Sequence, residues 1–401
     1  MSSDARIGTA NLFTNAVAIL EARQSSMSAL QTQLSSGLRV NQPSDDPAAA
    51  AQAEMDQTRL SQLQANQRAL GLQTDAMTQA ESTLSSAVTA VQSFRSLVVS
   101  AGNSAYSAQD VQSIVQQLKT LRDQVFSLAN TQNSNGQPLF AALGSALTPF
   151  VQQSSASPTY TFNGVAGQSQ STGVSIPYAL DGEKAFMLNP ATDGSYNVTY
   201  GTNVGQTTTS SVSVQTPSAV TGASYQIQFS SNAGVTQYTV NQVSPPGVVV
   251  PATNYTAGSP ITFGGLSLSV NGTPQPGDSI NVQPNDSIFS VMDQAIAAIG
   301  TAGTNTARSQ AVSQALANID IGMNNLQTAE SQAGNLLNQA TSITNSENTL
   351  NTQLQTDQSH AQDVDMVKGI SDFQNAQTGY TAALKSYAQI QQLSLFNYVN
   401  P

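Results

Sequence analysis

The sequence contains no cysteine and no tryptophan among its 401 residues. The absence of cysteine excludes disulfide bonds, thiolate nucleophiles and metal sites built from cysteine ligands. It suits a protein that meets oxidising surroundings, or one that crosses a membrane unfolded and must avoid cross-linking. The length allows roughly two or three domains.

Charged residues are also scarce, at 9% of the sequence, against a usual share of about a quarter. The polar surface must therefore consist mainly of Gln, Asn, Ser and Thr side chains. The charges that are present sum to −11, and binding to phosphate backbones needs clustered Lys and Arg. We expect no nucleic-acid partner.

The usual signs of catalysis are missing. The single histidine, His360, stands in a polar stretch with Gln358 and Asp363, which is typical of a solvated surface residue rather than a general base or metal ligand. One histidine cannot supply the His-Glu-x-x-His pattern of metalloproteases, and no glycine-rich phosphate loop occurs. Asp45 and Asp46 are adjacent, so we expect their side chains to diverge as helix caps. We therefore expect no enzyme, and no catalytic residue, cofactor or metal.

Long apolar runs are absent as well. No segment approaches the roughly 20 apolar residues of a membrane span, so we expect no membrane insertion. The first ten residues have neither a basic nor an apolar region, which predicts that no signal peptide is cleaved.

The strongest positive signal is an apolar residue at every seventh position through one long stretch. These residues are Leu63, Leu70, Met77, Leu84, Val91 and Val98. Because no proline interrupts them, the spacing predicts one helix roughly 60 Å long at about 1.5 Å per residue. Similar seams recur over 111–128 and 312–326, and Leu336, Ile343 and Leu350 continue the second seam in a shifted register.

The middle of the chain has a different pattern. Twelve of the 16 prolines lie between Pro149 and Pro284. Short runs with period-two alternation, separated by turn formers, predict antiparallel strands there. The clearest runs are 196–200, 225–229, 237–241 and 266–270.

These patterns predict an α+β fold. Helices from both chain ends form a long antiparallel, coiled-coil-like rod, and an inserted antiparallel β domain lies at its tip. The expected segments are a terminal helix (1–42), the first part of the rod (43–150), a β-rich outer domain (151–284), the second part of the rod (285–358) and a second terminal helix (359–401).

The two terminal helices, roughly 9–38 and 364–395, carry narrow apolar seams and few charges. A pair of helices leaves much of each seam exposed, and isolated helices are marginally stable in water. We therefore expect these ends to become fully ordered when other copies cover them, although the seams could also be ordinary core. The residues expected at such an assembly interface are Phe13, Val17, Leu20, Met27, Leu30, Leu34, Arg39, Ile370, Phe373, Tyr380, Leu384, Tyr387, Leu395 and Phe396.

A connector joins the first helix to the next. Gly37 is a candidate C-terminal cap, Pro43 keeps the chain extended, and one of Ser44, Asp45 or Asp46 caps the following helix. Arg39 is either a solvated loop residue or an intersubunit or intrahelix anchor. The residues of this junction motif are Ser36, Gly37, Arg39, Asn41, Pro43, Ser44, Asp45, Asp46 and Pro47.

The connector also carries a family resemblance. Residues 35–41, Ser-Ser-Gly-Leu-Arg-Val-Asn, followed by 43–47, Pro-Ser-Asp-Asp-Pro, resemble the N-terminal signature of the flagellin superfamily. The Pro-Ser-Asp-Asp-Pro form resembles the hook-associated protein 3 (FlgL-type) family more than filament flagellin. Residues 380–387 and 393–399 are similar to that family's last helix.

This resemblance implies a structural protein of the bacterial flagellum. It would be exported through the flagellar type III channel, with an export chaperone, and would lie outside the cell. There it would self-assemble into a junction between hook-associated protein 1 and the flagellin filament. Two other functions stay open at this point: filament flagellin itself, or a surface adhesin that binds a host or glycan through the β domain.

Overall fold

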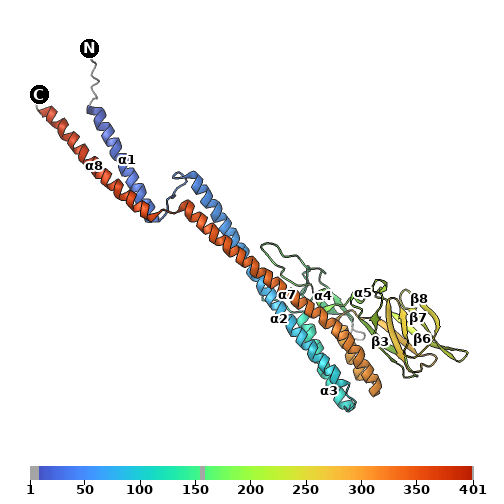
Figure 1. The fold of residues 1–401 in the computed structure, drawn as a ribbon. Helices are drawn as coiled ribbons and strands as arrows, with labels where there is room; N and C mark the ends of the chain where they lie inside the picture. The colour runs from blue at the N-terminus through green and yellow to red at the C-terminus, as the bar shows by residue number, and fades with distance from the viewer. Residues whose placement is uncertain (1–8, 154–158, 400–401) are drawn as a thin grey trace. The chain divides into compact units, whose positions relative to one another are not determined.

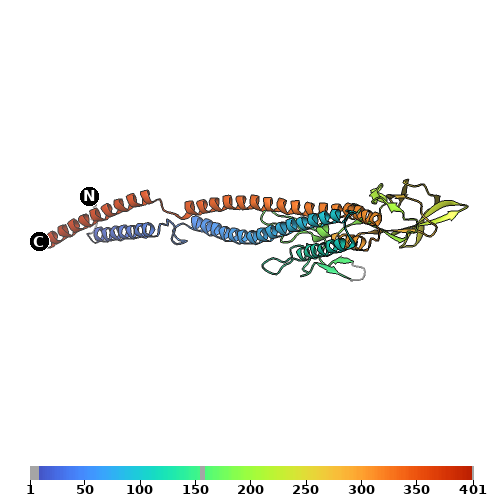
Figure 2. The same ribbon diagram turned by 90° about the horizontal axis from the view of Figure 1, so that it is seen from below.

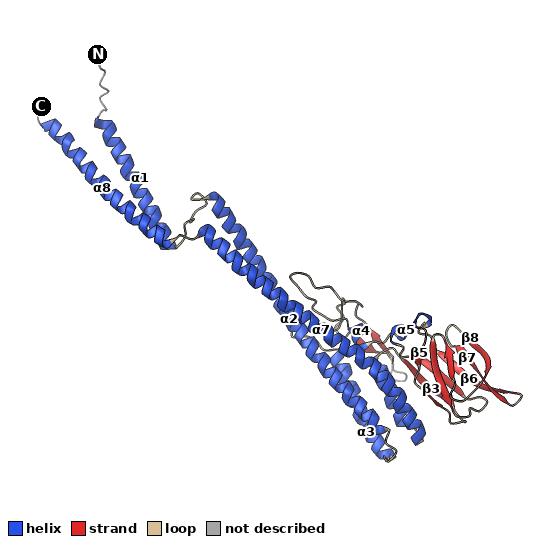
Figure 3. Cartoon of the chain, in the orientation of Figure 1, coloured by secondary structure: helices blue, strands red, loops and turns tan. Residues whose placement is uncertain are grey.

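The computed structural model describes the backbone of residues 9–153 and 159–399, with side chains from Thr14 to Gln389 within these ranges and at Gln391. Long helices occupy both ends of this sequence and antiparallel strands occupy its centre (Figures 1 and 3), which confirms the expected α+β organisation. The chain divides into two compact units, one of Met1–Gln67 with Thr344–Pro401 and one of Arg68–Ile343.

The predicted long helix is α2, Pro47–Ala101, whose 55 residues span about 80 Å at about 1.5 Å each. All six predicted seam residues are buried, and Met77, Leu84, Val91 and Val98 each have 0% of their surface exposed. Apolar residues seven apart return to nearly the same face of a helix, so the stripe can be covered along its whole length. The prediction of this helix and its seam is confirmed.

The unit of Arg68–Ile343 has a helical core. It is shared by α2, α3 (Ala108–Ala129), α6 (Ile288–Thr301) and the first part of α7 (Asn305–Gln362). Capping boxes begin α3 at Ser107 and α6 at Ser287, where the serine hydroxyl accepts a backbone N–H of the first turn.

The segment between α3 and the main sheets also packs into this helical core. It contains β1 (Phe150–Gln152), β2 (Tyr160–Phe162), α4 (Gly182–Phe186) and α5 (Pro190–Asp193). The rings of Phe150, Tyr160 and Phe186 lie 5.7, 5.1 and 5.8 Å, centroid to centroid, from the ring of Phe289 on α6. These aromatic contacts tie the segment to the helices, whereas the expected outer domain began at residue 151.

The remaining strands form two antiparallel sheets. The larger has the order β3–β11–β6–β7–β8, and in the smaller β4, β5 and β9 pair with β10. Side chains from both sheets, such as Phe229 and Val282 from the larger and Leu268 from the smaller, share a second hydrophobic core. The elements are β3 (Tyr196–Thr202), β4 (Thr208–Thr209), β5 (Ser213–Val214), the 3-10 turn η1 (Pro217–Ala219), β6 (Tyr225–Asn232), β7 (Val235–Gln242), β8 (Gly247–Asn254), β9 (Pro260–Phe263), β10 (Leu266–Asn271) and β11 (Ser279–Pro284).

All four strands expected from the period-two runs are present, in β3, β6, β7 and β10. Since the second core begins at Tyr196, we propose 196–284 as the separate β domain and leave the other expected boundaries as proposals.

In the other unit, α1 (Thr9–Ser36) and α8 (Met366–Val399) pack side by side, as both views show (Figures 1 and 2). The first turns of α2 meet the last turns of α7 in a small cluster of Leu60, Leu63 and Leu354. Leu350, an expected seam residue, is 47% exposed, so the expectation is wrong at that position. The buried seam steps instead from Ile343 through Glu347 to Leu354, an interval of 11 residues. Such an interval corresponds to about 3.67 residues per turn, against about 3.5 for a seven-residue repeat.

Over the part of the chain that the structure describes, no helix has an apolar stretch long enough to cross a bilayer.

Candidate assembly interface and junction motif

The described side chains of the terminal helices are much less buried than those of the helical core in the unit of Arg68–Ile343. Among the described side chains of α1 and α8, no large hydrophobic residue is buried. Ile370 and Leu384 are 46% and 40% exposed. The other described residues of the expected interface on these helices are half-buried: Val17, Leu20, Met27, Leu30, Leu34, Phe373, Tyr380 and Tyr387. Three expected residues, Phe13, Leu395 and Phe396, lie outside the described side chains.

Further large apolar side chains are exposed on these two helices. They are Ile19, Met366 and Val367, and Val367 is 83% exposed. Ile19 and Val367 fall outside the seven-residue spacing, so they belong to no predicted seam. Exposed apolar surface of this kind is a feature of surfaces that bind other proteins.

Two glycines allow α1 and α8 to approach each other. A Cβ atom at Gly369 would lie 3.0 Å from Cδ2 of Leu34, and one at Gly379 would lie 2.8 Å from Nη1 of Arg23. Larger residues would force these neighbours to move. The spacing of hydrophobic residues contains no signal for such contacts.

The junction motif ends α1 and begins α2. Gly37 has a φ of 74°, the left-handed conformation that glycine adopts without strain, and its N–H bonds to the carbonyl of Gln33 at 2.9 Å. Asp46 accepts the N–H of Ala49 at 3.1 Å and so caps α2, which begins at Pro47. The bond from the Ala49 N–H holds the pKa of Asp46 below its ordinary value, and the bond from Arg39 has the second-largest effect in the same direction.

Asp45 has a different role from Asp46. Its carboxylate accepts the N–H groups of Asn41 and Gln42 at 3.0 and 2.9 Å, which closes the loop before α2. The two adjacent carboxylates therefore serve separate sets of donors, as the capping interpretation predicted. Ser36 accepts the N–H of Leu38 at 3.1 Å, while Pro43 and Ser44 are exposed.

Arg39 anchors the loop within the chain. Its guanidinium bonds to Asp46 Oδ2 at 3.0 Å and to the carbonyl of Ala361 at 2.8 Å. Its backbone N–H bonds to the carbonyl of Gln362 at 2.6 Å, and the N–H of Val364 bonds to the carbonyl of Gly37 at 2.9 Å. We call this set of bonds between residues 37–46 and 361–364 the clasp.

The start of α8 lies directly beside the clasp. Asp365 accepts the N–H groups of Val367 and Lys368, both at 3.0 Å, and so caps α8. This cap was not predicted, although an aspartate before an apolar-periodic stretch is a general signal for one. The C-terminal end of α1 and the N-terminal end of α8 are thus both defined at the clasp.

His360 is exposed, as expected. No group of three His, Asp or Glu side chains in the described part of the chain is arranged to hold a metal ion.

Comparison with known proteins agrees with this arrangement. Residues 7–144 match the family model described as the bacterial flagellin N-terminal helical region. Residues 198–284 match the D2-like domain of flagellar hook-associated protein 1. Flagellar hook-associated protein 3 of Salmonella typhimurium is 36% identical over 151 residues, or 37% of this chain and 46% of that protein. The Escherichia coli protein of the same name is 39% identical over 125 residues, or 30% of this chain and 38% of that protein. The matches thus span less than half of either relative.

Solved structures match a larger part of the chain. The Legionella pneumophila flagellar junction protein FlgL is 27% identical, with a TM-score of 0.59 over 72% of this chain and 99% of that one. A hook-associated protein 3 structure from the same species is 27% identical, with a TM-score of 0.64 over 76% of this chain and 97% of that one. Fold and matched segments together show that this chain is similar to proteins of the flagellin superfamily. These relatives are of the FlgL type, the hook-associated protein 3 group, which confirms the resemblance found in the sequence.

Proposed function

We propose that the chain is a structural subunit of the bacterial flagellum that assembles into the junction between hook-associated protein 1 and the flagellin filament. The observation that carries this proposal is the incomplete burial of the apolar seams on α1 and α8. The names of its relatives supply the location. Filament flagellin and a surface adhesin are not favoured, because these relatives are hook-associated and junction proteins.

The terminal seams are the surfaces that we assign to assembly. Transfer of apolar surface out of water contributes about 25 cal/mol for each Å² covered, so half-covered seams retain free energy for association. Both helices carry few charges, with only Glu21 and Arg23 on α1 and Lys368, Asp372 and Lys385 on α8. Copies can therefore approach closely without burying many unpaired charges.

The clasp has a supporting role in this proposal. It fixes where α1 ends, where α8 begins and how the loop between α1 and α2 is closed, all through bonds within one unit. Arg39 was expected at the assembly interface, and we now propose that it contributes by shaping the clasp. The proposed partners are hook-associated protein 1, flagellin and further copies of this chain. We also propose that an export chaperone binds the chain and that it is exported without a cleaved signal peptide. Its proposed role is purely structural, without enzymatic activity.

Deletion of the gene in its own bacterium tests this function. The hooks should stay intact while unpolymerised flagellin escapes into the medium, and the intact gene supplied on a plasmid should restore filaments. Electron microscopy of the hooks, with immunoblots of the medium for flagellin, gives both readouts. Normal filaments in the deletion strain would reject the proposed junction role.

Copy number separates the junction from the filament. A junction needs about one or two rings of subunits, whereas a filament needs thousands, so labelling should find the protein at one short zone beside the hook. Label along the whole filament would instead identify a filament flagellin.

A further inference from the structure

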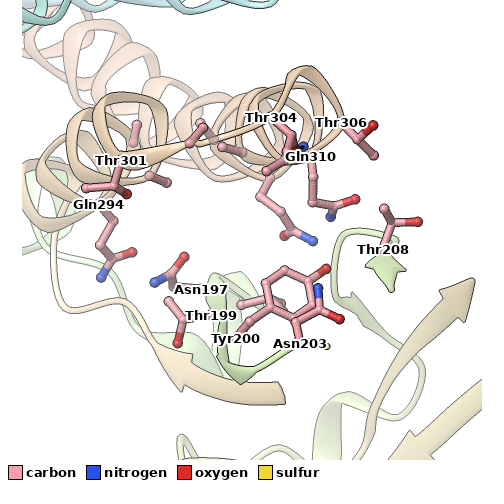
Figure 4. Close-up of a pocket in the computed structure, with 18 of the residues that line it drawn as sticks. Asn197, Thr199, Tyr200, Asn203, Thr208, Gln294, Thr301, Thr304, Thr306 and Gln310 are labelled. Atoms are coloured by element: carbon pink, nitrogen blue, oxygen red, sulfur yellow. Dashed lines mark hydrogen bonds between the residues drawn. The ribbon is translucent and has the colours of Figure 1, made fainter. Parts of the chain in front are cut away.

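A cleft of about 500 Å³ opens in the unit of Arg68–Ile343. One wall is β3 with the loop after it, and the other is made by α6 and the start of α7 (Figure 4). Its volume lies within the roughly 300–1,000 Å³ typical of small-molecule sites. The flagellar function proposed above gives this cleft no role.

The lining of the cleft is polar but uncharged. It consists of hydroxyl, carboxamide and small apolar side chains with one tyrosine, and the described residues contribute no Asp, Glu, Lys, Arg or His to it. An ionic ligand would lose hydration there without gaining an opposite charge. Carboxamides and hydroxyls offer donors and acceptors side by side, which matches a neutral ligand rich in hydroxyl groups.

Several of these polar groups have no partner within the described residues. The side chains of Asn197 and Thr199 on β3 and of Gln294 on α6 lie in the lining without a hydrogen bond. Gln310 is held in place, because its Nε2 donates to the carbonyl oxygen and Oγ1 of Thr209 at 2.5 and 3.1 Å. Its Oε1 remains available as an acceptor.

The apolar part of the lining is small. Ala298 on α6 and Ala307 on α7 leave space that larger residues would fill, and both are exposed. Tyr200 adds an aromatic ring from β3, and its hydroxyl bonds to Oγ1 of Thr209 at 3.4 Å. A flat apolar contact beside fixed amides suits a sugar ring, which carries C–H groups on its face and hydroxyls around its edge.

From these features we infer that the cleft between β3 and α6–α7 binds a neutral saccharide. Its hydroxyl groups bond to Asn197, Gln294 and Gln310, and its C–H face lies against Tyr200 and the alanines.

Binding of neutral disaccharides to the full chain tests this inference. Cellobiose, lactose and N,N′-diacetylchitobiose are titrated and followed by saturation-transfer NMR, with digalacturonic acid as the anionic comparison and a capped, uncharged Ser-Asn-Gln-Thr peptide as the peptide comparison. At least one of the three neutral disaccharides should bind. Digalacturonic acid should bind more weakly than each neutral disaccharide that binds.

Two variants locate the binding. Ala298→Phe fills the cleft and should weaken disaccharide binding by about tenfold or more. The matched control Ala297→Phe adds the same ring at the neighbouring exposed position, outside the lining, and should leave binding unchanged. If Ala298→Phe fails to fold, Gln294→Ala decides instead, because it removes one hydrogen-bonding group without adding volume and should weaken binding by about tenfold.

Three results would overturn the inference. They are no binding of any of the three disaccharides to the wild-type chain, binding of the peptide where the disaccharides do not bind, and binding of a disaccharide to the cleft variants as tight as to Ala297→Phe.

Discussion

The change Leu384→Asp tests the assembly surface most sharply among single substitutions. Leu384 is 40% exposed in the isolated chain. Full burial of a leucine side chain contributes about 1.5–3 kcal/mol, so covering the remaining surface adds about 0.6–1.2 kcal/mol per subunit. An aspartate in the same place would lose that gain and would also carry its charge into the contact.

The expected penalty falls mainly on assembly. Burying a carboxylate without a partner costs several kcal/mol, and about 3 kcal/mol already lowers an association constant by more than about 100-fold. The isolated chain should change little, because the exposed side of Leu384 lets an aspartate reach water. Thermal unfolding of the unit of Arg68–Ile343 should therefore match the wild type.

The assay is complementation of the deletion strain. Cells with Leu384→Asp should export the protein but carry few filaments, counted by electron microscopy. Ser386→Asp is the matched control, since it adds the same charge at an exposed position about 200° around α8. Normal filaments with Leu384→Asp would refute the reasoning, and an equal defect with Ser386→Asp would show that charge on α8, rather than loss of the seam, is responsible.

Three further predictions concern stability. Leu84→Ala removes a side chain with no exposed surface and should lower the free energy of unfolding by about 2–5 kcal/mol in urea titrations. The control Ser85→Ala, at an exposed position, should leave it unchanged. Equal effects of the two changes would contradict the burial of the α2 seam. Glu347 is buried, neither carboxylate oxygen has a partner in the described part of the chain, and burial raises its pKa above 4.5. Glu347→Leu should therefore raise the free energy of unfolding by about 1–3 kcal/mol at pH 7. This gain should shrink as the pH falls through the raised pKa towards 4.5, because the wild-type carboxyl group is then neutral in the folded protein. A gain that does not change with pH would contradict this prediction. Gly37→Ala should lower the free energy of unfolding by about 1 kcal/mol, because residue 37 has a φ of 74°. It should also speed hydrogen exchange of the Val364 amide, which bonds to the carbonyl of residue 37. An unchanged exchange rate would show that the clasp tolerates a side chain there.

The sequence predicted those features that depend on local periodicity. The α2 seam from Leu63 to Val98 and the strands of the β domain follow from spacings of seven and two, because each repeat places apolar side chains on one face. The C-terminal cap at Gly37 was also predictable, since caps are set by neighbouring residues. The N-terminal cap of α2 was narrowed to Ser44, Asp45 or Asp46, and the structure has it at Asp46.

Features that depend on distant partners were not predictable. The clasp joins Arg39 to Ala361 across 322 residues of sequence, and no local pattern records that contact. Likewise, Tyr160 lies in the segment that composition assigned to the β domain, but its ring packs on Phe289 of α6. At Leu350 the seven-residue extrapolation failed because the buried seam there shifts to an 11-residue interval.

The central claim is that the terminal helices become fully ordered only when other copies cover them. Amide hydrogen exchange tests it most directly, by comparing the isolated chain with the chain in its polymer. In the isolated chain, residues before Arg39 and after Val364 should exchange fast while 60–128 stay protected, because only the latter have a buried seam. In the polymer, α1 and α8 should gain protection and 60–128 should change little. Uniform slow exchange to both ends of the isolated chain would contradict the claim that copies complete these helices.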